Sequence, residues 1–140
     1  MISRDLAIAL KEAGLRWHPE SGDRFQLDLP SDVEPDVEAD VFTVSEMTIE
    51  SRQTPSGVTI LAFNGTTEWA LDAVSVEEAI WLPAEEQLRE LLRGAFRSLR
   101  RLPDAYEVEA EIAGERLRFE HPDASEAYGR ALLELVTRSR

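Results

Sequence analysis

The spacing of apolar and polar positions predicts a helix near each end of the chain. Ser3 can cap the first helix, and Gly14 can end it. Its apolar positions recur at helical spacing, at Leu6, Ala9, Leu10 and Ala13. Asp123 can cap a final helix, with Glu126 at its third position. The apolar stripe of that helix is Ala127, Tyr128, Ala131, Leu132, Leu135 and Val136.

Two further helices are predicted in the middle of the chain. Ser75 to Glu78 has the sequence of a capping box, which predicts a short helix from Val76 to Trp81. Pro83 suits the first position of a longer helix. Its expected apolar stripe is Leu88, Leu91, Leu92, Ala95 and Leu99, and its expected basic last turn contains Arg97, Arg100 and Arg101.

Extended segments rich in β-branched and aromatic residues lie between these helices. Two short ones, 15–17 and 25–29, are separated by a turn at 19–22. Longer strands are predicted at 41–52 and 58–63, joined by the turn Thr54-Pro55-Ser56-Gly57. The alternation in the first of them slips near Ser45-Glu46, which we interpret as a β-bulge.

A second hairpin can be placed in register by its apolar and charged positions. If Ala113-Gly114 is the turn, three apolar or turn-flanking pairs follow, Ile112 with Glu115, Ala110 with Leu117 and Val108 with Phe119. The opposite face then pairs Glu111 with Arg116 and Glu109 with Arg118. One face is therefore expected to be apolar and the other to carry alternating charge.

The element order α-β-β-β-α-α-β-β-α contains hairpins rather than parallel crossovers. It predicts an α+β fold, with an antiparallel sheet built from two hairpins and helices packed on it. The length of 140 residues predicts a single domain over 1–140. Residues 28–40 carry six acids, two prolines and no base, so we expect a mobile acidic loop there.

Net charge restricts the classes of partner. With 28 acidic and 15 basic side chains, the chain carries −13. This charge disfavours direct binding to nucleic acid and to an anionic membrane surface. It favours solubility, and it would also attract a basic protein. There is no cysteine, no transmembrane stretch and no visible signal peptide, so we expect a cytoplasmic protein.

The sequence contains no recognisable catalytic, cofactor or metal motif. The seven glycines are never closer than eight residues, which excludes a Walker A or Rossmann loop. An EF-hand counted from Asp32 would place Val37 and Thr43 where glycine and glutamate are required. His18 and His121 both precede proline, where a ring commonly meets solvent. We therefore assign no catalytic, cofactor-binding or metal-binding residue.

Four residues remain as candidates for an interaction surface or a site. Glu68 and Asp72 are acids among apolar neighbours, where burial would shift a carboxyl pKa, although a cap or a solvated strand position is the simpler explanation. Trp69 and Trp81 form the apolar centre of the sequence. Large aromatic residues are usually core, and the alternative is an exposed patch for a partner or a second subunit.

The sequence resembles a known group of proteins over nearly its whole length. The run FNGTTEWALD (63–72), followed by Trp81-Leu82-Pro83 and QLRELL (87–92), resembles small actinobacterial proteins of unknown function and short phage-type proteins. Some carry the label of the pilus assembly protein CpaE, which implies a longer ATPase with a phosphate-binding loop. The present sequence has no such loop, so the resemblance supplies no functional residue. Residues 119–136 also resemble a HicB-type antitoxin segment.

These observations favour a non-enzymatic protein-interaction module, with a homodimer as one form of it. The first alternative is a phage- or antitoxin-related regulator whose acidic surface binds a basic protein. The second is a small enzyme that uses Glu68 or Asp72 with a histidine.

Overall fold

The structure, a computed structural model, describes residues 1–28, 40–45, 49–63 and 73–139. The fold is α+β, as predicted, with α-helices and small antiparallel sheets. The chain divides into two compact units, one of Met1–Arg16 and Leu82–Arg140 and the other of Trp17–Trp81. The single domain expected over 1–140 stays a prediction, with these units as its parts.

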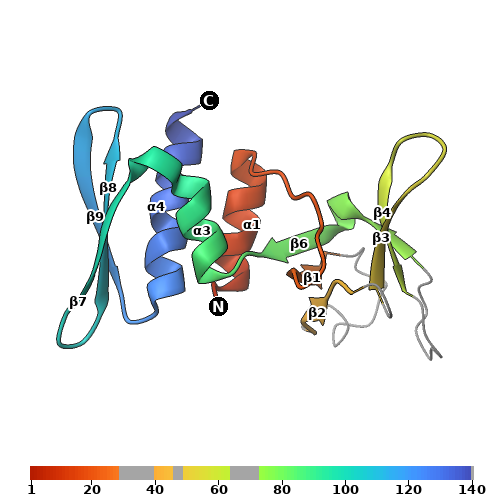
Figure 1. The fold of residues 1–140 in the computed structure, drawn as a ribbon, viewed down its shortest axis with the longest axis horizontal. Coiled ribbons are helices and arrows are strands. Elements are labelled where there is room, and N and C mark those ends of the chain that lie inside the picture. Colours follow the sequence, from red (N-terminus) through yellow and green to blue (C-terminus); the bar gives the residue numbers. More distant parts are fainter. Residues whose placement is uncertain (29–39, 46–48, 64–72, 140) are drawn as a thin grey trace. The chain divides into compact units, whose positions relative to one another are not determined.

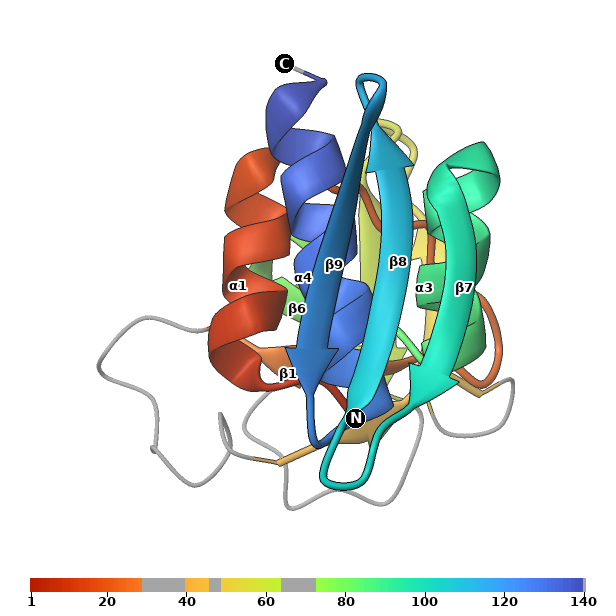
Figure 2. The same ribbon diagram turned by 90° about the vertical axis from the view of Figure 1, so that its left-hand side faces the viewer.

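The first unit is a three-stranded sheet covered by helices on one face (Figures 1 and 2). Its helices are α1 (Arg4–Ala13), α3 (Glu85–Leu92) and α4 (Ala124–Arg138), and its strands are β7 (Phe96–Arg101), β8 (Tyr106–Ile112) and β9 (Glu115–His121). The strand order is β7-β8-β9, so β8 is central. Helix α4 packs against β8, β9, α1 and α3. The fully buried Tyr128 of α4 lies 5.7 Å from Phe96, measured between ring centroids.

The predicted caps of the first and last helices are confirmed. The Ser3 hydroxyl accepts a hydrogen bond from the Leu6 amide at 3.2 Å, and Gly14 ends α1 with a φ of 111°. The Asp123 carboxylate accepts from the Ser125 amide at 2.8 Å. Glu126, only 7 % exposed, accepts from the Ser3 amide and so connects α1 to α4.

The long helix predicted from Pro83 is wrong in its second half. Helix α3 ends at Leu92, Arg93 takes a φ of 51°, and a 3-10 turn (Arg93–Ala95) leads into β7. Arg97, Arg100 and Arg101 therefore lie on a strand and not in the last turn of a helix. These residues form a strand rather than a helix because their backbone amides and carbonyls form hydrogen bonds with β8.

The second unit contains two sheets. Its strands are β1 (Arg24–Leu27), β2 (Phe42–Thr43), β3 (Ile49–Gln53), β4 (Thr59–Phe63), β5 (Ala73–Ser75) and β6 (Ala79–Leu82), whose last residue belongs to the first unit. The strand orders are β2-β1-β6 and β3-β4-β5. The predicted turn between β3 and β4 is confirmed, with Gly57 at a φ of 87° and its amide bonded to the Thr54 carbonyl at 2.8 Å.

Two expectations for the second unit need correction. The strand expected over 41–52 is two strands in different sheets, β2 and β3, and the slip in alternation falls between them. The helix expected from Val76 to Trp81 is a 3-10 turn (Val76–Glu78) followed by β6. The capping box is present, since Glu78 accepts from the Ser75 amide at 3.3 Å, but the apolar run after it pairs with β1.

In place of one sheet built from two hairpins, the described residues thus form three antiparallel sheets of three strands each. The register of the second hairpin is confirmed at every predicted pair. Its turn residues Ala113 and Gly114 have φ values of 52° and 79°, the left-handed conformations of a type I′ turn. Most of the predicted acidic loop at 28–40 lies outside the described residues.

Candidate interaction surface

The outer face of the β7-β8-β9 sheet carries charged side chains in rows. Alternation along β8 directs Val108, Ala110 and Ile112 toward the helices, where all three are buried. The opposite face presents a row of glutamates, Glu107, Glu109 and Glu111. On β7 this row is flanked by Arg97 and Arg100, and on β9 it is flanked by Arg116 and Arg118.

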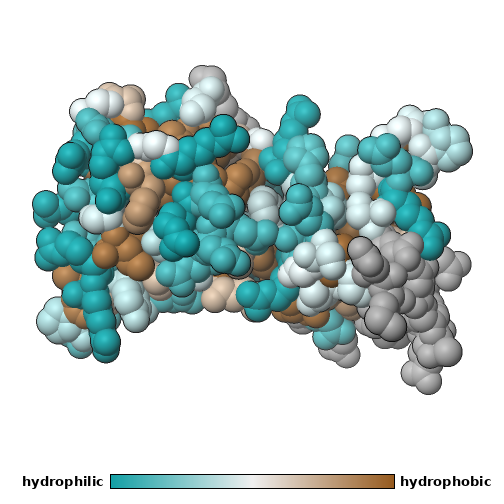
Figure 3. All heavy atoms as spheres, in the orientation of Figure 1, coloured by the Kyte–Doolittle hydropathy of each residue, from teal (hydrophilic) through white to brown (hydrophobic). Residues whose placement is uncertain are grey.

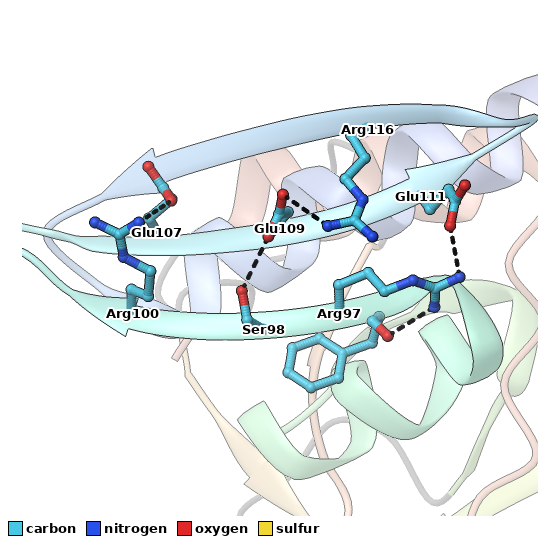
Figure 4. A network of polar contacts seen from close by, with 8 residues as sticks. Arg97, Ser98, Arg100, Glu107, Glu109, Glu111 and Arg116 are labelled. Carbon is cyan, nitrogen blue, oxygen red and sulfur yellow. Dashed lines mark hydrogen bonds and ion pairs between the residues drawn. The ribbon is translucent and has the colours of Figure 1, made fainter.

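Ion pairs connect these rows (Figure 4). Arg97 donates to Glu111 at 2.7 Å, and Arg100 lies 3.9 Å from Glu107. Glu109 accepts from Ser98 at 3.3 Å and from Arg116 at 3.5 Å.

The ion pairs differ from those predicted, although the backbone register is the same. Arg116 reaches diagonally to Glu109 rather than to Glu111 directly opposite. As a result Arg118, which faces Glu109 in the register, loses its expected partner.

The first two charged residues of β9, Glu115 and Arg116, form ion pairs within the first unit. Arg138 of α4 lies 3.3 Å from Glu115 and 2.7 Å from Glu134. These hydrogen bonds, first that with Glu134 and then that with Glu115, raise the pKa of Arg138 above its ordinary value. Together with the contact of Arg116 to Glu109, they give both charged residues at the start of β9 a partner.

The later charged residues of β9, Arg118 and Glu120, differ in this respect. Within the described ranges, neither Arg118 nor Glu120 forms an ion pair or a side-chain hydrogen bond, and both are exposed. Glu120 stands opposite Glu107, which is only 5 % exposed, so its nearest cross-strand neighbour has the same charge. A positive charge beside Glu120 would therefore be favourable.

Among the strands that the structure describes, β9 is the last of its sheet, so within this part of the chain its backbone is also unpaired on one side. A two-residue turn makes Ile112 and Glu115 a hydrogen-bonded pair, and such pairs then alternate along the hairpin. The amide and carbonyl groups of Arg116, Arg118 and Glu120 consequently point away from β8. They form a row of donors and acceptors along the open edge.

The inner face of β9 is incompletely covered. Leu117 and Phe119 are half-buried, whereas their cross-strand neighbours Ala110 and Val108 are fully buried. The open edge thus combines backbone groups without a strand partner, two unpaired charged side chains and partly covered apolar area. We call the segment from Arg116 to Glu120 the β9 edge.

The predicted tryptophan candidate Trp81 lies in the second unit and packs against its hydrophobic core. Its ring is stacked on Trp17, with centroids 6.2 Å apart and planes 10° apart. Its indole Nε1 is buried and has no hydrogen-bond partner in the described part of the chain. Trp17, by contrast, donates to the buried Asp23 carboxylate at 2.9 Å. Trp81 therefore contributes to packing, and an interaction role for it stays a prediction.

The other predicted candidates, Glu68, Trp69 and Asp72, lie outside the described residues. His18 is exposed, as its position before Pro19 suggested. His121 accepts a hydrogen bond on Nδ1 from the Asp123 amide at 2.9 Å, so it supports the cap of α4.

Two kinds of feature are absent from the described residues. No group of three or more histidine, aspartate or glutamate side chains there could hold a metal ion. No helix in the same residues is long and apolar enough to cross a membrane. On the face shown in Figure 3, hydrophilic side chains predominate, with smaller hydrophobic areas between them.

Sequence reasoning found the charged face but not the β9 edge. Arg116 and Arg118 were expected on a charged face, opposite Glu111 and Glu109, whereas Glu120 was not singled out. The sequence did not show that β9 lies at the margin of its sheet. That position follows from β7, which the sequence predicted as a helix and which pairs with the other side of β8.

Comparisons with known proteins leave the resemblance to small actinobacterial proteins a prediction. No family model, no curated protein and no solved structure matches the chain.

Proposed function

We propose that the protein is a non-enzymatic, cytoplasmic interaction module that binds another protein chain through the β9 edge. The observation that carries this proposal is the state of Arg118 and Glu120. They are exposed and unpaired on the open strand of an otherwise ion-paired sheet face.

Addition of a strand is the binding mode that such an edge supports. A partner strand would satisfy the outward amides and carbonyls of the β9 edge, and its side chains would face Arg118 and Glu120. Backbone hydrogen bonds would supply affinity, and the two charges would select the partner and its register.

The alternative of a regulator that binds a basic protein draws support from the net charge of −13. It differs in expecting contact through the acidic surface at large. The enzyme alternative depends on Glu68 and Asp72, which lie outside the described residues, so the observed geometry adds no support to it.

Site-specific photo-crosslinking in the cell that produces the protein tests the proposal. A photoreactive amino acid replaces Arg118 in the full chain, and the matched control replaces Glu90, which is exposed on α3. We expect protein adducts from position 118 that are absent or much weaker from position 90, with mass spectrometry identifying the adduct.

Because backbone hydrogen bonds are expected to supply the affinity, the contact should survive loss of the Arg118 charge, and absence of adducts from position 118 would contradict the proposal. Equal adducts from both positions would contradict it as well, because contact would then not be specific to the β9 edge. A basic protein crosslinked from both positions would favour the regulator.

A further inference from the structure

We infer that the partner of the β9 edge is a second copy of this chain, paired antiparallel to the first with Phe119 on the two-fold axis. This inference rests on the proposed function, since it names the partner of the same edge. It is carried by the backbone pattern, the two unpaired charges and the half-covered apolar side chains of β9.

The backbone pattern permits this pairing. A two-fold axis through Phe119 places Arg118 opposite Glu120 of the second copy, and Glu120 opposite its Arg118. The amides and carbonyls of both residues already point outward, so each of these positions becomes a hydrogen-bonded pair. Phe119 then faces its own copy as a non-hydrogen-bonded pair, where side chains approach most closely.

The charges favour this register. Each unpaired Arg118 meets an unpaired Glu120 of the other copy, so both charges gain a partner without breaking an ion pair in the first unit. The incoming arginine also lies beside Glu120, whose present cross-strand neighbour is Glu107. Opposite charges at directly facing positions stabilise a strand pair, and like charges destabilise it.

Neighbouring registers that keep the apolar faces together are less favourable. An axis through Arg118 would place the two copies of that arginine opposite each other. An axis through Leu117 would place Arg116 opposite Arg118 twice, and an axis through Glu120 would place two glutamates together. A shift by one position between strands would instead turn the apolar face of one copy outward.

The apolar side chains of β9 support the same arrangement. Phe119 and Leu117 are half-buried on the face that carries the helices. A second copy related by an axis perpendicular to the sheet places its helices on that same face. Phe119 would then pack against Phe119 of the other copy, where an aromatic pair contributes beyond simple burial.

Other described edges are less suitable for pairing with themselves. At seven residues, β9 is the longest edge strand that the structure describes. The other edge of the same sheet is β7, with the sequence FRSLRR. Two copies of β7 would bring six arginines together with no acid among them. In Figure 2, β9 lies at one margin of the sheet, with α4 behind it.

Sedimentation equilibrium of the purified full chain tests the inference by reversing charges. Because an edge pairing is smaller than a standard stable interface, we expect the wild-type chain to form a weak dimer whose population rises with protein concentration. Arg118→Glu places two glutamates opposite each other twice, and Glu120→Arg places two arginines opposite each other twice. We expect each variant to weaken the dimer by about tenfold or more.

Mixing the two variants tests the inferred register itself. The Arg118→Glu chain has glutamate at both positions, and the Glu120→Arg chain has arginine at both, so the inferred register makes every facing pair complementary. We expect the mixture to form a heterodimer at least as strong as the wild-type dimer. Circular dichroism checks that both variants fold, which their exposed positions favour.

A control separates this pairing from the effect of net charge. Glu120→Arg and Glu90→Arg both make the chain less negative by two charges, which lessens general repulsion between copies. We expect Glu90→Arg to leave the dimer unchanged or slightly stronger, while Glu120→Arg weakens it. A wild-type chain that stays monomeric at 1 mM, or a dimer that neither reversal weakens, would overturn the inference.

The two proposals fail in different ways. If the purified chain is monomeric but position 118 crosslinks to a different protein in the cell, the interaction function stands and self-pairing is wrong. If the chain is monomeric and position 118 gives no adduct, both are wrong.

Discussion

The hairpin turn at Ala113 offers a sharp test of the structure of the first unit. Ala113 has a φ of 52°, a left-handed conformation that costs an ordinary L-residue about 1–2 kcal/mol. Asparagine tolerates this conformation and is preferred at this position of a type I′ turn before glycine. We therefore expect Ala113→Asn to raise the free energy of unfolding by about 0.5–1 kcal/mol.

Two further substitutions give the series an internal order. Ala113→Gly relieves the same strain of about 1–2 kcal/mol but adds freedom to the unfolded chain worth about 0.4–1 kcal/mol, so we expect a net gain similar to that of Ala113→Asn. Ala113→Val puts a β-branched residue at positive φ and should lower the free energy of unfolding by at least about 1 kcal/mol. The expected stability order is Asn and Gly above Ala, with Val lowest.

Urea unfolding followed by far-UV circular dichroism measures this order. The helices α1, α3 and α4 belong to the first unit, whereas all three tryptophans lie in Trp17–Trp81, so fluorescence reports on the other unit. Ala105→Asn is the matched control, because Ala105 precedes β8 without a positive φ. If Ala113→Asn destabilised the unit as much as Ala113→Val, the assigned turn would be wrong.

Three further outcomes are expected from other contacts. Trp17→Phe should lower the free energy of unfolding of the second unit by about 1–3 kcal/mol, because the buried Asp23 carboxylate loses its indole donor. The fluorescence of the two remaining tryptophans follows this transition, and no change would show that Asp23 does not need this bond. A Cβ at Gly129 would lie 2.6 Å from Leu6 Cδ2, so Gly129→Ala should destabilise the wild-type chain more than it destabilises a Leu6→Ala chain. In urea unfolding we expect the double variant to lose about 1 kcal/mol less stability than the sum of the two single losses. Additivity within about 0.3 kcal/mol would contradict the contact. Glu126→Leu should lower the free energy of unfolding by about 1.5–3 kcal/mol in the same assay, since it removes the buried acceptor of the Ser3 amide. Its control, Glu134→Leu, removes a more exposed ion pair and should lower the free energy of unfolding by less.

Local signals predicted much of the fold where short-range chemistry decides structure. Ser3, Asp123 and Gly14 mark helix ends through groups that bond within a few residues. The β8–β9 register followed from one turn and the matching of charges across it. These features were predictable because both partners lie close together in sequence.

Elements decided by distant pairing were harder to predict. The segment after Leu92 carries leucines and arginines at helical spacing, yet it pairs with β8 as β7. Ile80 and its neighbours follow a capping box, yet they pair with β1. In both cases a sheet partner outside the local window outweighs helix propensity.

The candidate site shows the same limit at the level of side chains. The sequence predicts Arg118 opposite Glu109, and the backbone register agrees. Arg116, however, reaches Glu109 diagonally, and this choice leaves Arg118 unpaired. Only the arrangement of all three strands reveals that the unpaired residue lies at an open edge.

Amide hydrogen exchange of the full chain at low and high protein concentration tests the central claim most directly. Within one copy the amides of Arg118 and Glu120 point to the open edge, while those of Leu117 and Phe119 bond to β8. Pairing through the β9 edge predicts that Arg118 and Glu120 become protected as concentration rises, with Leu117 and Phe119 protected throughout. Exchange at Arg118 and Glu120 that is equally fast at both concentrations would contradict it.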